Sequence, residues 1–326
     1  MPTPTPAELL GLGLAGAAAA GLGLRFSSPT PRRGEAFLQC CGVAAPTPEE
    51  CERAATYLRQ HRQIFLVLVV LLVPGLTGLT ALVGEGEASL IWGLAGGLVG
   101  GALLTLVVAE VSRSTSRRQS TGRLRRRPCR VLRSLDPFHL AAIVVTLALF
   151  VCGLLAAVVG FAAQRWAHHV VTWYSQRADL IGAVATPPQG FARLWLVLTL
   201  LVAVAAATTA AVWLSLFRYP EPDDSLDAVL RLRTARVALG TGALACALLT
   251  IAALRRLTVI VMPRLDVWVE RALPPALAWD FPALPGWLPP VHQILDSFLA
   301  PVLTGCALCV AVLVHPALWR RGERSG

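Results

Sequence analysis

Residues 137–164 read PFHLAAIVVTLALFVCGLLAAVVGFAAQ and contain no Asp, Glu, Lys or Arg. The hydrocarbon core of a bilayer is about 30 Å thick, so an α-helix needs about 20 apolar residues to cross it. This run is long enough to cross alone, and a helix satisfies its own backbone hydrogen bonds where water is absent. The stretch therefore predicts a transmembrane helix.

Similar apolar runs recur along the whole chain. Hydrophobic residues make up 55% of the 326 residues and charged residues only 15%, whereas soluble domains carry about 25% charged residues. We expect an all-α, polytopic transmembrane helical bundle that forms one integral membrane domain over residues 1–326. It should have about seven spans, or six if the short run 9–24 does not cross. The spans are expected near residues 8–24, 63–84, 88–110, 138–163, 193–217, 237–258 and 296–319.

The distribution of arginine predicts the orientation of the bundle. All 29 basic residues are Arg, and 22 of them fall in alternate loops that would share one side of the membrane. Loops on the cytoplasmic side are enriched in basic residues. We therefore place the linker 25–62, the Arg-rich loop 112–136 and the carboxyl terminus in the cytoplasm, and the amino terminus outside if 9–24 spans. The composition, rich in Ala, Leu, Gly and Pro and lacking Lys, is typical of GC-rich codon usage and favours a bacterial cell-membrane protein.

The Arg-rich loop is the strongest candidate for binding at the membrane surface. It reads SRSTSRRQSTGRLRRRPCRVLRS over residues 112–134. Such a loop can anchor to anionic lipid headgroups or dock an acidic protein partner. It lacks the interleaved aromatic side chains on which bases stack, so nucleic acid is an unlikely partner. The candidate residues are Arg117, Arg118, Arg123, Arg125, Arg126 and Arg127.

Two local patterns predict how helices begin and pack. Thr47-Pro48-Glu49-Glu50 is a capping-box pattern with proline at the first helical position, so a helix should begin at Pro48 and run into the second span. Pro74 should kink that span because proline removes a backbone hydrogen bond. Gly93, Gly97 and Gly101 recur every four residues and predict a face that lets another helix approach closely. We favour a contact within the chain over a homodimer.

The acidic and basic residues of 218–236 are predicted to complement a helix dipole. Asp223, Asp224 and Asp227 precede the three arginines at 231, 233 and 236. Acidic residues in the first turn and basic residues later favour the helical conformation.

Metal or proton chemistry has one candidate location, the predicted external face. The segment 259–295 is rich in Pro and Trp and should lie at the membrane interface. Residues of the types that bind metals occur in this segment and just after the predicted span 138–163. Both groups should lie on the external face, but they match no defined zinc signature. We expect them to be scattered, with no metal and no cofactor bound. The candidates are His168, His169, Glu270, His292 and Asp296.

These observations lead to three functional hypotheses. The chain has no GxxxxGK[ST] loop, so we do not expect it to power transport with ATP by itself, and few charges lie within its spans. The leading hypothesis is a non-catalytic scaffold, or a transport- or translocation-associated subunit that works with partners. The alternatives are a membrane-embedded enzyme with an outer-face site and a secondary transporter. The substrate, the partner and the oligomeric state stay open.

Overall fold

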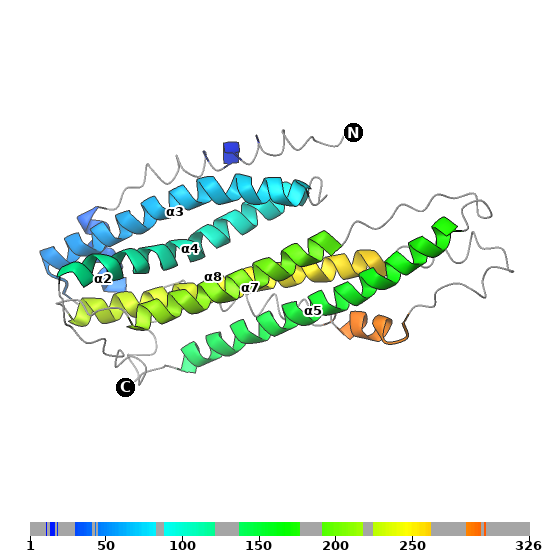
Figure 1. Ribbon diagram of the computed structural model, residues 1–326. Coiled ribbons are helices and arrows are strands. Elements are labelled where there is room, and N and C mark those ends of the chain that lie inside the picture. Colours follow the sequence, from blue (N-terminus) through cyan, green and yellow to red (C-terminus); the bar gives the residue numbers. More distant parts are fainter. Residues whose placement is uncertain are drawn as a thin grey trace. The chain divides into compact units, whose positions relative to one another are not determined.

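Every regular element in the described part of the chain is an α-helix. The computed structural model describes residues 30–40, 43, 45–82, 88–120, 137–176, 191–217, 224–261, 285–294 and 297, with a few positions between 11 and 18. No strand occurs among them, as the sequence predicts. The helices are α2 (Pro31–Cys40), α3 (Pro48–Leu82), α4 (Ala88–Ser120), α5 (Pro137–Gln176), α7 (Phe191–Phe217) and α8 (Asp224–Val261) (Figure 1).

Five of these helices are long and apolar enough to cross a membrane. Each contains all or nearly all of one of the predicted spans that begin near residues 63, 88, 138, 193 and 237. The predicted spans 8–24 and 296–319 lie almost wholly outside the described residues. The candidate spans are Pro48–Ala81, Trp92–Ser112, Ala142–Val170, Leu194–Leu216 and Leu230–Leu254.

Two compact units emerge within the single domain that the sequence predicts. Unit 1 comprises Met1–Thr146, Val204–Ala245 and Ala307–Gly326, and unit 2 comprises Leu147–Ala203 and Cys246–Cys306. The boundaries cross α5, α7 and α8, so each of these helices contributes to both units. The two units are described separately below.

In unit 1, α3 and α4 pack against each other along the glycine face of α4 (Figure 1). A Cβ atom placed on Gly97 would lie 2.7 Å from the Cα atom of Val73, and one on Gly93 would lie 2.7 Å from the Cα atom of Thr77. One turn further on, the same position at Gly101 lies 3.0 Å from Val69. A side chain at the first two positions would collide with the α3 backbone, so glycine is required there for this approach.

The amino end of α3 has the predicted capping box. The Glu50 carboxylate accepts hydrogen bonds from the Thr47 amide at 2.6 Å and from the Thr47 hydroxyl at 3.0 Å. The Glu50 amide in turn donates to the Thr47 hydroxyl at 3.3 Å. The helix runs on through Pro74 to Leu82. At about 1.5 Å per residue, a helix of 35 residues is longer than the hydrocarbon core is thick.

The segment 25–62, predicted to be a linker, contains a short helix, α2, ahead of the start of α3. Helix α2 begins at Pro31, and the Thr30 carbonyl accepts from the amides of Arg33 and Gly34. Gly34 lies against α3, where an added Cβ would meet the Cys51 carbonyl oxygen. This ten-residue helix has too few apolar residues to be recognised from the sequence. A helix this short is only marginally stable alone, so its packing on α3 stabilises it.

Helix α8 is the most buried span, with 61% of its apolar window inside the structure, compared with 17% for α7. In unit 1, Ala238 packs with Leu103, Leu106 and Ala211. In unit 2, the Thr250 hydroxyl lies 3.4 Å from the Leu149 carbonyl oxygen and 2.8 Å from that of Cys246. Small side chains along α8 allow this burial.

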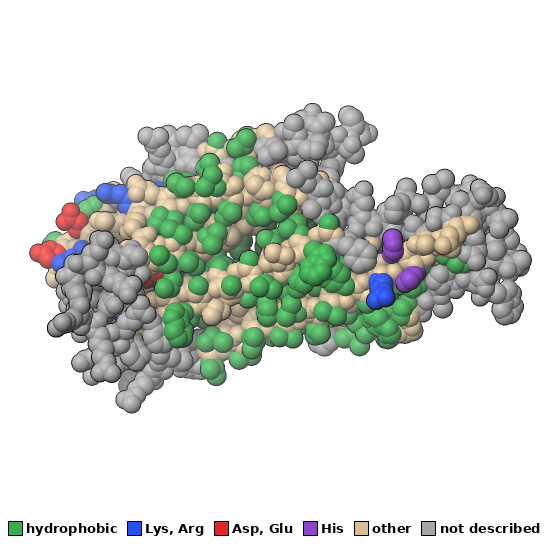
Figure 2. All heavy atoms as spheres, viewed as in Figure 1, with side chains coloured by type: hydrophobic (Ala, Val, Ile, Leu, Met, Phe, Trp, Pro, Cys, Tyr) green, Lys and Arg blue, Asp and Glu red, His purple; other side chains and the backbone are tan. Residues whose placement is uncertain are grey.

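Helix α5 carries an exposed apolar stripe over residues 140–158. Apart from the adjacent pair Ile143 and Val144, the exposed residues follow one another at intervals of three or four, which places them on one helix face. A surface of this kind is suited to lipid and ill suited to water. Figure 2 shows apolar side chains spread over the surface of the long helices. The α5 residues are Leu140, Ile143, Val144, Leu147, Val151, Leu155 and Val158.

Candidate functional site

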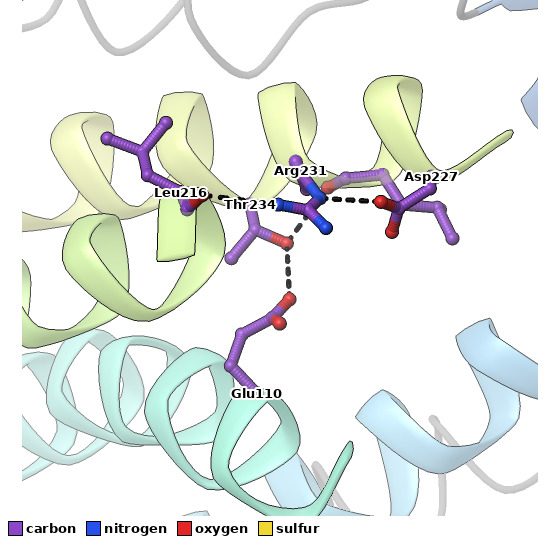
Figure 3. A network of polar contacts seen from close by, with 6 residues as sticks. Glu110, Leu216, Asp227, Arg231 and Thr234 are labelled. Carbon is purple, nitrogen blue, oxygen red and sulfur yellow. Dashed lines mark hydrogen bonds and ion pairs between the residues drawn. The ribbon is translucent and has the colours of Figure 1, made fainter. Parts of the chain in front are cut away.

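Unit 1 contains a buried polar network where the carboxyl end of α4 meets the amino-terminal part of α8 (Figure 3). Within the described residues, this is where acidic and basic side chains are buried together. Asp227, Arg231 and Glu110 are each at most 4% exposed. Burial of charge costs several kcal/mol per ion unless partners compensate for the lost water, so the contacts of these groups decide whether the fold tolerates them.

The first part of the network is an ion pair within α8. Arg231 Nε lies 2.6 Å from Asp227 Oδ2, one helical turn away. Arg231 Nη1 also donates to the Leu216 carbonyl oxygen at 3.1 Å, near the carboxyl end of α7. The last carbonyls of a helix have no partner within that helix, and a guanidinium is a favourable one. Arg231 therefore neutralises a buried carboxylate and satisfies a neighbouring helix end.

The second part joins three helices through Thr234. The Thr234 hydroxyl donates to Glu110 Oε1 at 3.1 Å and lies 3.4 Å from the Tyr57 hydroxyl. It also reaches the Leu230 carbonyl oxygen of its own helix at 3.0 Å. Thr234 is on α8, Glu110 on α4 and Tyr57 on α3, so one buried hydroxyl connects all three helices.

The third part continues from Tyr57 toward the surface. Arg233 Nη1 donates to the Tyr57 hydroxyl at 3.1 Å. The Arg233 guanidinium carbon lies 4.9 Å from the Phe37 ring centroid and 5.6 Å from that of Tyr57. Both distances allow cation–π attraction. Arg233 is only partly buried, so the polar network ends beside a side chain that contacts solvent.

Buried apolar residues surround the part of the polar network at Tyr57. Leu38 of α2, Cys51 and Ala54 of α3 and Leu230 of α8 are buried together around Tyr57. The His61 ring lies 4.1 Å from the Tyr57 ring, and its Nδ1 is 3.3 Å from the Tyr57 carbonyl oxygen. We call α2, residues 48–62 and residues 224–236 the polar cap. It is an ordered assembly of three helical segments.

Asp227 has a role beyond the helix-dipole complementation that the sequence indicates. It lies in the first turn of α8, as that interpretation requires, and it is also buried and bound to Arg231. Asp223 and the Asp224 side chain lie outside what the structure describes. The i, i+4 spacing of Asp227 and Arg231 was the available signal for the pair. Its further contact with the Leu216 carbonyl oxygen of α7 is not specified by the local sequence.

The structure describes three of the five predicted outer-face candidates. His168 and His169 are exposed on α5, where Figure 2 shows histidine side chains at the surface, and His292 is buried in the helical segment 288–294. Glu270 and Asp296 lie outside the described residues. Among the residues that are described, no group of three or more His, Cys, Asp or Glu side chains is placed to hold a metal ion.

The Arg-rich loop falls largely outside the described residues. Arg117 and Arg118 are in the last turns of α4, where the backbone is described and the side chains are not. Arg123 and residues 125–127 follow the end of α4 and are not described. Their predicted role in headgroup or partner binding therefore stays a prediction.

Comparison with known proteins gives no further identification. The chain matches no protein-family model, and no curated protein or solved structure shows significant similarity to it. The protein class that the structure supports is an all-helical chain with five candidate membrane spans in its described part.

Proposed function

We propose that this chain is a non-catalytic membrane component, a scaffold or a transport-associated subunit, that presents its polar cap to a protein partner. One observation carries the proposal. Buried charged groups of unit 1 are engaged by other groups of the protein, as in the pair Asp227–Arg231 and the hydrogen bond from the Thr234 hydroxyl to Glu110. Groups engaged in this way order a surface, whereas groups that act on a substrate must be open to it.

The outer surface of the cap carries the charges that such a contact would use. Its exposed charges have both signs, and the pair Glu49–Arg53 is 3.6 Å apart with both side chains exposed. Mixed charge gives orientation and selectivity to a protein contact. If the arginine asymmetry sets the orientation, the cap faces the cytoplasm together with the Arg-rich loop. The other exposed charges are Arg32, Arg33, Glu35, Glu52 and Arg59.

The proposal can be tested by complementation of a deletion strain with full-length variants. Charge reversal of the exposed cap residues Arg32, Arg33 and Arg53 should abolish complementation, at unchanged protein level. The triple substitution of His168, His169 and His292 by Ala should complement fully. Reversal of Arg165, which is exposed on α5 outside the cap, is the matched control and should also complement. The opposite pattern, loss with the histidine variant alone, would support the outer-face enzyme.

A secondary transporter is the second candidate, and Glu110 is the observation that favours it. This carboxylate is fully buried within the candidate span Trp92–Ser112. Ionisable groups inside membrane spans commonly belong to ion or proton paths. Solute flux into vesicles that contain only this chain, abolished by Glu110→Gln, would establish transport. Vesicles without flux, together with failed complementation by the cap variant, would support the scaffold.

A further inference from the structure

Helix α7 has a buried face and an exposed face. A series of its buried residues recurs every seven positions, which is about two helical turns, and these are Leu194, Leu201, Thr208 and Ser215. The exposed residues lie on a different face and follow one another at intervals of three or four, apart from the adjacent pair Val202 and Ala203. We call them the exposed stripe of α7. The stripe consists of Ala192, Trp195, Thr199, Val202, Ala203, Ala206, Thr209 and Trp213.

An exposed Trp lies near each end of this stripe. Trp195 is 59% exposed and Trp213 is 58% exposed. They are 18 positions apart, which is about five helical turns, so both project from the same face of the helix. At about 1.5 Å per residue, they are about 27 Å apart along the helix axis, close to the thickness of about 30 Å of a hydrocarbon core. Trp is enriched at both membrane–water interfaces, so this spacing suits one Trp at each interface.

The polar groups of the stripe donate their hydrogen bonds within α7. The Thr199 hydroxyl donates to the Trp195 carbonyl oxygen at 2.8 Å, and the Thr209 hydroxyl donates to the Ala205 carbonyl oxygen at 2.8 Å. A polar group in hydrocarbon is costly unless the protein itself supplies its hydrogen bond. The sequence from 194 to 217 also contains no Asp, Glu, Lys or Arg. The stripe between the two Trp residues is therefore compatible with an acyl-chain environment.

The ring of Trp195 is positioned by an aromatic contact in unit 2. Its centroid lies 5.1 Å from that of Phe161 on α5, and the two rings meet edge to face. Aromatic pairs favour this geometry. The contact leaves most of Trp195 exposed, so Phe161 orients the ring at the surface without covering it.

A second helix is the competing occupant of the stripe. Small residues in its middle, such as Ala203 and Ala206, would allow another backbone to approach. The exposed rings of Trp195 and Trp213 at both ends would hold a straight helix away from these small residues. An apolar surface of this length is also ill suited to water. Lipid fits the whole stripe, because acyl chains adapt to both the small residues and the rings.

We propose that the exposed stripe of α7 contacts the acyl chains of the bilayer, with Trp195 at one membrane interface and Trp213 at the other. The hydrocarbon core then extends over the residues of α7 between these two rings. The inference rests on the candidate span Leu194–Leu216 and not on the scaffold role. It goes beyond that role because it assigns α7 to lipid and leaves the polar cap as the face for a protein partner.

Fluorescence quenching by brominated lipids tests the proposal. The purified full-length protein is reconstituted in phosphatidylcholine vesicles whose acyl chains carry bromine either close to the headgroup or close to the chain end. The emission that is lost in Trp195→Phe, and that lost in Trp213→Phe, should be quenched more by the shallow bromine than by the deep one. Trp173, which is 8% exposed, is the control, and the emission lost in Trp173→Phe should be quenched least.

A Trp introduced in the middle of the stripe gives the opposite depth. Val202 is 52% exposed and lies between the two natural Trp residues. The additional emission of Val202→Trp should be quenched more by the deep bromine than by the shallow one. Because this variant keeps Trp195 and Trp213, it decides whether the stripe faces lipid even if a Trp→Phe variant does not fold.

Three results would overturn the proposal. Stronger quenching of Trp195 or Trp213 by the deep bromine would mean that the interface does not lie at that ring. Absence of quenching by either lipid would mean that protein or water covers the stripe. Quenching that appears only when the protein is strongly diluted with lipid would identify a second copy of the chain as the occupant.

Discussion

Arg231 and Asp227 form a buried ion pair, with Nε 2.6 Å from Oδ2 and neither side chain more than 6% exposed. Asp227→Ala would leave the Arg231 guanidinium buried without its carboxylate. We expect a loss of stability of about 3–5 kcal/mol, which is typical when one partner of a buried pair is removed. Thermal unfolding in detergent measures it. The double variant Asp227→Leu/Arg231→Met should recover most of the loss, and a double variant as unstable as the single one would refute the ion-pair explanation.

The exposed pair Glu49–Arg53 provides the matched control for that experiment. The side-chain atoms are 3.6 Å apart, and the side chains of Arg53 and Glu49 are 51% and 84% exposed. Water and salt screen such a pair, so Arg53→Ala should cost less than about 1 kcal/mol. A cost equal to that of Asp227→Ala would mean that burial is not what makes the inner pair important.

The glycine face of α4 predicts a difference between two glycines on one helix. Gly97→Leu places a side chain against the Val73 backbone, whereas Gly100 has nothing within 4 Å of an added Cβ. Gly97→Leu should therefore lower the unfolding temperature in detergent strongly, and Gly100→Leu only slightly. Leu94→Ala, which trims the same contact without forcing the helices apart, should also cost less than Gly97→Leu. Equal tolerance of the two leucine variants would show that α3 does not pack here.

Docking of α2 on α3 can be followed through a thiol. Cys51 is 8% exposed and lies beneath Gly34. Gly34→Leu should displace α2, because the new side chain would meet the Cys51 backbone, and alkylation of Cys51 should become faster. Ala36→Leu makes a larger side chain on the exposed face of the same helix and should leave the rate unchanged. Slow alkylation of Cys51 in both variants would argue that α2 is not what shields this thiol from solvent.

The sequence predicted the features that depend on neighbouring residues. Apolar runs located the five described spans, since a bilayer imposes a minimum length on each helix. The pattern from Thr47 to Glu50 located the start of α3 because a capping box is closed within one turn. The four-residue spacing from Gly93 to Gly101 located the face that packs on α3.

The polar network could not be predicted in this way because its parts are far apart in the chain. Tyr57 and Thr234 are 177 positions apart, and Glu110 and Thr234 are 124 apart. Nothing near Glu110 in the sequence indicates that a hydroxyl of α8 will lie against it. Helix α2 was missed for a related reason, since its burial depends on partners in α3 and α8.

Reporter fusions test the central claim most directly: that the helices cross a membrane with the polar cap and the Arg-rich loop in the cytoplasm. The asymmetry of 22 Arg residues against 7 predicts cytoplasmic signals for fusions at Arg118 and Gly326. Fusions at Gly86, Gln176 and Pro285 should give external signals. Gly86 precedes α4, and Arg118 lies in the last turns of α4 beyond the candidate span Trp92–Ser112. Opposite signals at these two positions would therefore establish that α4 crosses and place its Arg-rich end inside. An external signal at Arg118 would contradict the account.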